Sequence, residues 1–579
     1  MILGVDVGGT FTDAVLLADG ELRTAKVPTA ERQEESVVAA ARAVGAERVE
    51  RFTHGTTVAT NALLERRGAR TALVTTGGFE HVLHLRRQTR AHLYRLCAAH
   101  PEPLVPLDRC VGVDERLGPG GVIRPLDLAS LPQLDAEAVA VCLLFSFRDP
   151  SHERAVAAEV RRRLPHAHVV ASHEVAPEFR EYERASTAAA DAYLGPVVAR
   201  YLGALAAACR GAGLPEPLVL RSSGGVATLD EVAAHPATAL VSGPAGGAVG
   251  AALLARAAGF PRAISLDMGG TSTDVCLVED GRAGRAAERD VGGFPIRLPT
   301  VDIETVGAGG GSVVWRDAGG ALRVGPESAG AWPGPACYGR GGERPTVTDA
   351  NLLLGRLPQR LAGGLELDRA AAERAFAGAD PADAVAAVNA EMLRALRLVS
   401  VERGHDPREF ALVAFGGAGP LHACELADEL EVRTVLVPAA AGVLSALGLV
   451  ATEQRRDHVR SYLVPLREAG RLPEEGEADL RYRGQAFELA VPLGPRLEER
   501  FHRAHEERYG YADRGREVEL VAVRTADVVA GPELTLPAAS PAEVAGPAVL
   551  ELDGATAWIP PGWAGVRDGT GTWTLTREP

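Results

Sequence analysis

Two apolar runs, one at the start and one near the middle of the chain, each lead into an aspartate followed by glycines. The first run covers residues 2–5 before Asp6, and the second covers residues 263–266 before Asp267. Uninterrupted apolar runs of this length predict strands that are buried on both faces. Each aspartate therefore stands at the end of a buried strand, where a carboxylate without a partner is costly.

The second of these segments is a copy of the first, 261 residues further along the chain. Residues 6–20 and 267–281 agree at nine of fifteen positions. Each copy ends in an Asp-Gly pair, Asp19-Gly20 or Asp280-Gly281, which favours a hairpin turn. The offset is too long for a solenoid repeat and indicates two related lobes.

Each copy predicts a strand, a glycine turn and a second strand that together can hold a phosphate. Glycine lacks a Cβ, so backbone N–H groups can approach an anion, and threonine hydroxyls add donors. A carboxylate beside such a turn can bind Mg²⁺. The alternative is a tight hairpin in which these residues serve turn geometry alone. The predicted phosphate-binding residues are Gly8, Gly9, Thr10, Thr12, Gly269, Gly270, Thr271 and Thr273, and the predicted Mg²⁺ ligands and catalytic carboxylates are Asp6 and Asp267.

A third glycine-rich turn follows the strand-like run 410–415. Gly416, Gly417 and Gly419 surround the turn, and Pro420 stands where the first residue of a helix is expected. A helix N-terminus after glycines favours an anion or the edge of a nucleotide, so we predict that the three glycines contact adenosine. A purely structural turn is the alternative. The three motifs together resemble the acetate and sugar kinase, Hsp70 and actin superfamily, in which ATP lies between two lobes.

We therefore expect an α/β fold with two duplicated actin-like (ribonuclease H-like) lobes around a central cleft. A chain of 579 residues exceeds the size of a single hydrophobic core. Residues 1–170 are expected to form the first lobe, and residues 171–455 the second lobe with the adenosine turn. Residues 456–579 contain alternating apolar strands, such as 517–524, and predict a β-rich domain without a helical lid.

The composition argues against several other classes of protein. A net charge of −15 disfavours nonspecific nucleic-acid binding. Lys26 is the only lysine and lies in a stretch that looks exposed, so there is no P-loop and a Schiff base could form only there. Seven cysteines without a CxxC pair predict neither zinc nor disulfides, and with no secretory pattern we expect a cytoplasmic protein. The apolar stretch 435–451 includes Pro438 and glycines, which favours a buried strand and helix over a membrane span.

Longer motifs are more specific than the hairpins. They resemble signatures of the hydantoinase A/5-oxoprolinase family along the whole chain. They lie at residues 53–66, 174–184, 242–247, 306–312, 334–342, 346–351, 479–485 and 559–563. Three features depart from the family pattern. The region 467–478 is short where relatives have a long helical stretch, Glu304 stands where relatives often have histidine, and residues 90–95 lack a Pro and an Asp of a substrate-side segment.

The resemblance implies ATP-dependent opening of a cyclic amide such as a hydantoin or 5-oxoproline. Phosphorylation of the amide oxygen would make the carbonyl reactive, while the protein orients ATP and stabilises charge. The resemblance also implies ATP and Mg²⁺ as cofactors, a hydantoinase B-type partner subunit, and hence an oligomer. One alternative is a subunit of an ATP-dependent ketone carboxylase of the acetone carboxylase type. An actin-like ATPase that acts as a regulator is an alternative of another class.

Four further side chains carry weaker hypotheses. His54 lies in a small polar loop and is predicted to be catalytic, with a structural hydrogen-bonded histidine as the alternative. His422, just inside a predicted helix, is expected to be structural. Asp302 and Glu304 are alternate residues of a predicted strand and could share a metal or acid–base site. Exposed strand charges are the alternative for that pair.

Overall fold

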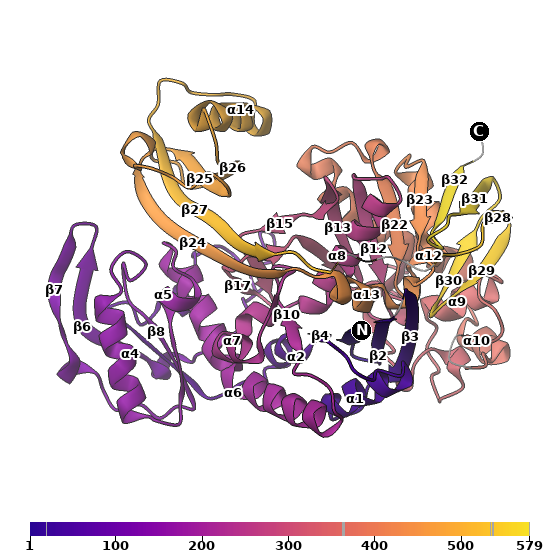
Figure 1. Ribbon diagram of the computed structural model, residues 1–579, viewed down its shortest axis with the longest axis horizontal. Helices are drawn as coiled ribbons and strands as arrows, with labels where there is room; N and C mark the ends of the chain where they lie inside the picture. Colours follow the sequence, from indigo (N-terminus) through magenta and orange to yellow (C-terminus); the bar gives the residue numbers. More distant parts are fainter. Residues whose placement is uncertain (19, 362–364, 533, 535–537, 578–579) are drawn as a thin grey trace.

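The computed structural model describes residues 1–18, 20–361, 365–532, 534 and 538–577, so Asp19 of the first predicted turn lies outside the described residues. The chain forms two large sheets and a smaller five-stranded sheet, with helices packed between and around them (Figure 1). Each large sheet contains one copy of the repeated hairpin. The prediction of a duplicated α/β fold is therefore confirmed.

The first large sheet has the strand order β26-β25-β27-β24-β11-β10-β4-β1-β2-β3. The first hairpin pairs β1 with β2 so that Asp6 lies opposite Asp13, and β4 runs parallel to β1. β3 then pairs antiparallel with β2. The strands are β1 (Ile2–Val7), β2 (Phe11–Ala18), β3 (Glu21–Pro28), β4 (Arg51–Gly55), β10 (Leu218–Leu220), β11 (Val226–Ala227), β24 (Gln454–Pro465), β25 (Glu477–Tyr482), β26 (Leu489–Pro492) and β27 (Val518–Val529).

The second large sheet repeats the same central arrangement. Its second hairpin pairs β12 with β13 so that Asp267 lies opposite Asp274, β22 runs parallel to β12, and β19 pairs antiparallel with β13. The path order is β14-β13-β12-β22-β23-β32-β31-β28. The strands are β12 (Ala263–Met268), β13 (Thr273–Glu279), β14 (Arg282–Ala283), β19 (Ile303–Val306), β22 (Ala411–Phe415), β23 (Thr434–Val437), β28 (Ala542–Ala545), β31 (Trp563–Arg567) and β32 (Trp573–Arg577).

Two helices rich in small residues join the lobes. α8 (Ser242–Ala257) and α13 (Leu444–Ala451) pack so closely that a Cβ at Gly448 would collide with the backbone oxygen of Gly246. A Cβ at Gly4 of β1 would likewise strike the carbonyl oxygen of Ala446 in α13. Glycine is required at these positions because only a residue without a side chain allows two backbones to approach so closely. The first hairpin is thereby held against the α8–α13 pair.

The helices of the first half cover the first lobe and the small sheet. α6 (Glu181–Gly211) packs on β8 and β17. Among the described residues it is the one helix long and apolar enough to cross a membrane, and 56% of its most apolar window is buried inside the protein. The other helices are α1 (Gln33–Ala43), α2 (Val58–Leu64), α3 (Val82–Leu85), α4 (Ser151–Arg163), α5 (Ser172–Val175) and α7 (Leu229–Ala234).

The remaining strands form the five-stranded sheet and several short hairpins. The five-stranded sheet consists of β5 (Thr71–Thr76), β6 (Cys110–Gly118), β7 (Gly121–Asp127), β8 (Ala138–Cys142) and β9 (His168–Ala171). The short pairs are β15 (Arg285–Ala286) with β18 (Thr300–Val301), β16 (Arg289–Val291) with β17 (Phe294–Ile296), β20 (Ser312–Arg316) with β21 (Leu322–Ser328), and β29 (Ala548–Leu552) with β30 (Ala555–Ile559). The helices of the second lobe are α9 (Val347–Leu353), α10 (Arg369–Ala375), α11 (Pro381–Val399) and α12 (Gly419–Glu429).

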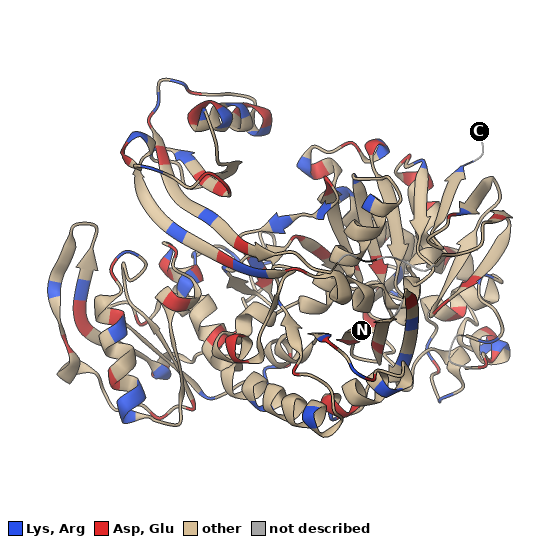
Figure 2. Ribbon diagram, viewed as in Figure 1, with Lys and Arg blue, Asp and Glu red and all other residues tan. Residues whose placement is uncertain are grey.

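The C-terminal region contributes strands to both large sheets. β24 and β27 form a long arm that projects from the body and carries β25, β26 and α14 (Leu497–Tyr509) at its tip (Figure 1). The region is rich in strands as predicted, but the sequence did not lead us to expect α14. Acidic and basic residues follow one another along the ribbon of the arm and are mixed over the body in this view (Figure 2).

Candidate functional site

The carboxylates of the two hairpins lie beside the same face of α8. A Cβ at Gly243 would lie 3.9 Å from Asp6 Oδ1, and a Cβ at Gly247 would lie 3.1 Å from Asp267 Oδ2. Helix residues four positions apart are neighbours on one face. The two aspartates, 261 residues apart in sequence, are thus brought together along a single helix face.

Two more glycines enclose the same carboxylates from the neighbouring strands. Gly55 ends β4, and a Cβ there would collide with Asp6 Oδ1. Gly416 follows β22 with φ +76°, and a Cβ there would collide with Asp267 Oδ1. Each aspartate is therefore held between a strand-end glycine and a glycine of α8. The sequence predicted Gly416 to contact adenosine, and the structure adds that this glycine makes room for Asp267.

Burial and mutual repulsion make both carboxylates difficult to ionise. Burial, and then the nearby Asp13 carboxylate, raise the pKa of Asp6 to about 7. Burial, and then Asp274, Asp6 and Asp13, raise the pKa of Asp267 to about 8, while the positive charge of Lys26 opposes both shifts. Because Asp6 acts on Asp267, the two lobes share one electrostatic site.

One oxygen of this site has no partner in the protein. Asp6 Oδ1 is shielded from solvent and accepts no hydrogen bond from any described residue. A buried acceptor without a donor is costly unless a cation or donor binds it. Mg²⁺ uses one or two carboxylates and otherwise keeps water or takes phosphate oxygens. Asp6 and Asp267 suit such an ion, and no described group of three or more His, Cys, Asp or Glu residues could hold a metal by itself.

The glycines at the tips of the two turns are not required by the fold. A Cβ at Gly9 or at Gly270 would meet no described atom within 4 Å, and both residues are exposed. Neither has a positive φ. Ordinary side chains would therefore fit these positions in the protein alone. Space that no protein atom claims is what a phosphate needs in order to approach the backbone.

The bases of the two turns are also alike. The backbone N–H of Gly8 donates to Phe11 O at 2.9 Å, and that of Gly269 donates to Ser272 O at 3.0 Å. Thr10 and Thr271, beside the tips, keep part or most of their surface exposed. The N–H groups of Gly8 and Gly269 thus close the turns, while Thr10 and Thr271 lie beside the open tips, and a role of these four residues in phosphate binding stays a prediction.

The threonines on the second strands are occupied inside the protein. Thr12 and Thr273 are fully buried. The Thr12 hydroxyl bonds to that of Thr29 at 3.0 Å, and the Thr273 hydroxyl donates to Ala308 O at 2.5 Å. Neighbouring strand residues face opposite sides of a sheet, so Thr12 points away from the face that carries Asp13. A place for these two hydroxyls in the phosphate cradle is untested and would require new partners.

The third glycine turn joins β22 to α12 and contacts the second hairpin. The N–H of Gly416 donates to Ala441 O at 2.9 Å, and that of Ala418 donates to Met268 O at 3.0 Å. A Cβ at Gly419 would lie 3.1 Å from Leu266 O, whereas one at Gly417 would meet no described atom within 4 Å. Close packing thus accounts for two of the three glycines, and the adenosine contact remains a prediction.

His54 has two protein partners. Its Nδ1 donates to Val5 O at 3.1 Å, so Nε2 accepts from the Tyr201 hydroxyl at 2.8 Å. Burial lowers the pKa of His54 to about 4, which keeps the ring neutral near pH 7. Both ring nitrogens thus have protein partners, as the structural alternative expects, and a catalytic role for His54 stays a prediction. These contacts hold β4 against β1 next to Asp6 and Gly55.

Asp302, Glu304 and His422 lie in protein contacts of their own. Arg403 donates to both oxygens of Asp302, and its pKa is raised by Asp302 and also by Glu304. The two carboxylates thus surround an arginine, which does not favour a metal between them. His422 Nδ1 lies 2.7 Å from Asn389 Oδ1, and burial lowers the pKa of this histidine to about 3. Its fully buried position agrees with a structural role.

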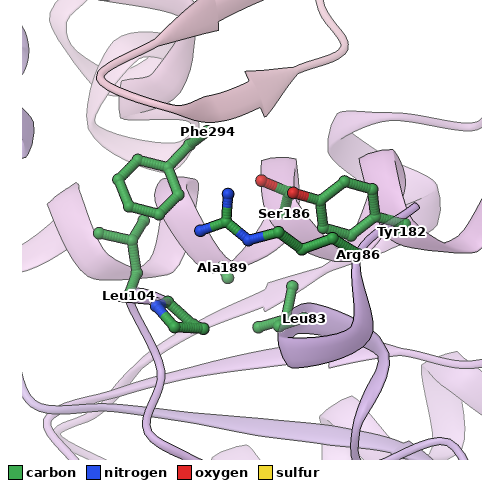
Figure 3. A pocket seen from close by; sticks show the side chains of 8 residues that line it. Leu83, Arg86, Leu104, Tyr182, Ser186, Ala189 and Phe294 are labelled. Atoms are coloured by element: carbon green, nitrogen blue, oxygen red, sulfur yellow. The ribbon is translucent and has the colours of Figure 1, made fainter. Parts of the chain in front are cut away.

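A cavity between α3, α6 and β17 is too small to hold a substrate. Figure 3 shows Arg86 running between Tyr182 and Phe294 in this cavity. Arg86 donates to the backbone oxygens of Gly293 and Pro101. The cavity has about 10 Å³ of space, enough for one water molecule at most.

Comparisons with known proteins cover nearly the whole chain. Residues 2–164 match the model described as the hydantoinase/oxoprolinase N-terminal region, and residues 184–458 match the hydantoinase/oxoprolinase model. The chain is 34% identical to the caprolactamase subunit alpha of Pseudomonas jessenii, over 99% of both chains. The crystal structure of the ATP-dependent caprolactamase from that organism matches with a TM-score of 0.85 and 31% identity, over 100% of both chains.

Two further relatives differ in what their names describe. The acetophenone carboxylase gamma subunit of Aromatoleum aromaticum is 36% identical over 77% of this chain and 67% of its own. The 5-oxoprolinase 1 of Arabidopsis thaliana is 36% identical over 76% of this chain but only 37% of its own length. The alignment with the caprolactamase subunit has 694 positions, 115 more than this chain has residues, so it contains gaps in this chain. The shortened region before Asp479 stays a prediction.

Proposed function

This chain belongs to the hydantoinase/oxoprolinase family, and from that premise we propose that it is the nucleotide-binding subunit of an enzyme that opens a cyclic amide with ATP. The observation that carries the proposal is that Asp6 and Asp267 lie together beside two glycine turns. No described protein atom fills the space beside the tips of these turns. A metal-bound polyphosphate would satisfy the carboxylates and fill the open tips together. ATP would transfer its terminal phosphoryl group to the amide oxygen and so make the carbonyl carbon reactive towards water. Departure of the ring nitrogen would then give an acyl phosphate, and its hydrolysis would release phosphate and the opened amino acid.

The residues of the chain would bind and orient rather than react. The N–H groups at the turn tips, at Gly9 and Gly270, would hold phosphate oxygens, and Asp6 and Asp267 would position Mg²⁺. Fixed donors and charges of this kind account for most of the catalysis of phosphoryl transfer. The raised pKa values of the two aspartates suit a site that is complete only when a cation is bound, because a cation returns both carboxylates to their ionised form.

We propose a second subunit of the hydantoinase B type as the partner. The names of two relatives, subunit alpha and gamma subunit, describe parts of larger enzymes. A cyclic amide needs its own binding site and a water molecule after activation. The partner subunit would supply part of that site.

A ketone carboxylase subunit is the second candidate function. The similarity to the acetophenone carboxylase gamma subunit favours it, since 77% of this chain aligns at 36% identity. Cyclic amide opening is preferred because the caprolactamase subunit aligns over 99% of both chains, including the C-terminal arm. Both reactions would use the same phosphate turns, so the substrate decides between them.

The test is ADP release by the purified chain, with and without its hydantoinase B-like neighbour. The substrates are caprolactam, 5-oxoproline, a panel of hydantoins, and ketones with bicarbonate. We expect one cyclic amide to stimulate ADP release only when both subunits are present, and the Asp267→Asn variant to abolish the stimulation. Stimulation by a ketone with bicarbonate alone would favour the second candidate. ATP turnover that no small molecule changes would contradict both.

A further inference from the structure

Lys26 completes a row of charged side chains across the first hairpin. Asp6 on β1 lies opposite Asp13 on β2, and Asp13 lies opposite Lys26 on β3. Residues directly opposite one another on neighbouring strands share a face of the sheet. The Lys26 ammonium lies 2.5 Å from Asp13 Oδ1, and 29% of the lysine side chain is exposed. The face that carries this first row also carries Gly4, which packs on α13 towards the second lobe.

The charge of Lys26 reaches both halves of the site. It opposes the rise in the pKa of Asp6, Asp13 and Asp267, which belong to both hairpins. The carboxylates there would repel a polyphosphate, so a nucleotide needs compensating cations in addition to a metal ion. Lys26 is a side-chain cation that already lies beside this cluster.

The second hairpin has a different side chain at the matching position. Its row runs from Asp267 through Asp274 to Thr305 on β19. The Thr305 hydroxyl donates to Asp274 Oδ1 at 2.5 Å, and Arg289 donates to that hydroxyl at 3.0 Å. In the second row the Thr305 hydroxyl therefore lies between the Arg289 cation and the Asp274 carboxylate. In the first row the Lys26 cation contacts the Asp13 carboxylate directly.

The composition of the chain makes this lysine more informative. Of the 61 lysine and arginine residues, 60 are arginine. An ammonium is compact and a guanidinium is a larger planar group, so the two are not interchangeable in a confined space. Lys26 lies in such a space. The Lys26 ammonium lies 5.4 Å from the centre of the Phe11 ring, and a Cβ at Gly554, in the turn between β29 and β30, would lie 3.2 Å from Lys26 Cε.

We propose that the Lys26 ammonium binds the terminal phosphate of the nucleotide, with Asp13 aiming it and Phe11 and the Gly554 turn restricting the space to a group smaller than a guanidinium. The inference rests on the proposed function in one respect, since it supposes that the nucleotide is ATP. A phosphate oxygen would then share or replace Asp13 as the partner of the ammonium. Charge-assisted hydrogen bonds of this kind are among the strongest that a lysine makes.

The first test compares ATP with ADP in equilibrium binding, at fixed Mg²⁺, for the wild type and the Lys26→Met and Lys26→Arg variants. Loss of a cation at the terminal phosphate should weaken ATP binding roughly 10- to 100-fold and leave ADP binding within about twofold. Lys26→Arg should behave like Lys26→Met. The matched control is Arg23→Met, which removes an exposed cation from the opposite face of β3 and should leave both affinities unchanged.

The outcomes separate this inference from the proposed function. A wild-type protein that binds neither nucleotide would contradict the proposed function itself. Normal ATP binding by Lys26→Met, or equal loss of ATP and ADP, would overturn the role of Lys26 at the terminal phosphate. A Lys26→Arg variant with the wild-type preference for ATP would overturn the size requirement.

The second test needs no variant, because Lys26 is the only lysine. An amine-directed acylating reagent can modify only Lys26 and the N-terminal amine, and peptide mass spectrometry reports the two sites separately. We expect ATP to slow modification of Lys26 at least about fivefold more than ADP does. The N-terminal amine should react at the same rate throughout. Equal protection of Lys26 by ATP and ADP would overturn the inference even if the variants fail to fold.

Discussion

The two hairpins have the same residues at their turns but different supports beneath them. In the first, Thr29 supports the turn from outside: its hydroxyl donates to Gly8 O at 2.9 Å and its N–H to Thr10 O at 3.0 Å. In the second, a glycine loop does so: Gly310 N–H donates to Gly269 O at 3.0 Å, and Gly311 N–H donates to Gly270 O at 2.7 Å. The duplicated strands therefore fix where the carboxylates lie, while unrelated segments fix the turns.

The difference extends to the rows behind the turns. Lys26 ends the first row with a charge, and Thr305 ends the second with a hydroxyl. The two hairpins place their aspartates alike, but the side chains around these aspartates differ. We infer that the two lobes have different roles in the shared site. Substitutions at matching positions can show how these roles differ.

The largest effects are expected at the two aspartates. Asp6→Asn and Asp267→Asn should each lower amide-stimulated ATP turnover about 100-fold or more, because each removes a charge from the site of phosphoryl transfer. Steady-state ADP release by the complex with its partner subunit measures this. A reduction confined to one variant would show that a single lobe provides the catalytic carboxylate.

The same variants should not destabilise the fold. The pKa values of about 7 and about 8 lie above the ordinary value, so the folded protein keeps protons that the unfolded chain releases. Stability is therefore lost as pH rises from about 4 towards 8, and a neutral asparagine removes that loss. We expect the apparent Tm at pH 8, without Mg²⁺, to equal or exceed that of the wild type. A lower Tm in both variants would contradict the burial of the two carboxylates.

Alanine at the turn tips should separate ligand binding from folding. Gly9→Ala and Gly270→Ala introduce a Cβ that meets no described atom. Folding should be unaffected or slightly stabilised, by up to about 1 kcal/mol, because alanine restricts the unfolded chain. Nucleotide affinity should fall roughly tenfold, because the methyl group occupies the space of a phosphate. Calorimetric unfolding and nucleotide titration of the same samples give both quantities, and unchanged affinity in both variants would exclude the tips from the site.

The strand-end glycines should differ between the lobes. Gly55→Ala places a methyl group against the Asp6 carboxylate, which is the end of a side chain and can move. Gly416→Ala collides with Asp267 and with the Met268 backbone oxygen, and also needs a positive φ. We expect Gly416→Ala to destabilise by about 2–4 kcal/mol and Gly55→Ala by about 1 kcal/mol. Gly417→Ala, which meets no described atom, is the control in urea unfolding. Equal losses for the two glycines would contradict the backbone collision.

The sequence predicted the parts of the site that depend on local pattern. Both hairpins and the third glycine turn follow from apolar runs and glycines close together in the chain, and all three occur where expected. Strand alternation alone would also have turned Thr12 away from Asp13, because adjacent residues face opposite sides. The sequence therefore already indicated that Thr12 and Asp13 face opposite sides of the sheet.

The parts that the sequence did not predict depend on contacts between distant segments. Gly243 is identified as a neighbour of Asp6 only when α8 is placed against β1, more than two hundred residues away. Lys26 looks exposed in its sequence segment, and only the pairing of β3 with β2 places it opposite Asp13. Composition marked it as the only lysine but could not say what it faces. Neither feature has a local signal.

The smallest effect is expected at Thr305, where the second row ends. Burial raises the pKa of Asp274, and the Thr305 hydroxyl holds that rise in check. Thr305→Val keeps the shape but removes the donor, so the pKa of Asp274 should rise further, and the loss of stability as pH increases above the ordinary carboxyl range should become steeper. The expected cost is about 1 kcal/mol at pH 8 and close to zero at about pH 3, where the carboxyl is mostly protonated in the folded and the unfolded state. Urea unfolding at the two pH values measures the difference. A cost that is the same at both pH values would mean that Thr305 supports packing and not the Asp274 carboxylate. In that case Lys26 would stabilise the carboxylate of its row, whereas Thr305 would have no such role in the second row.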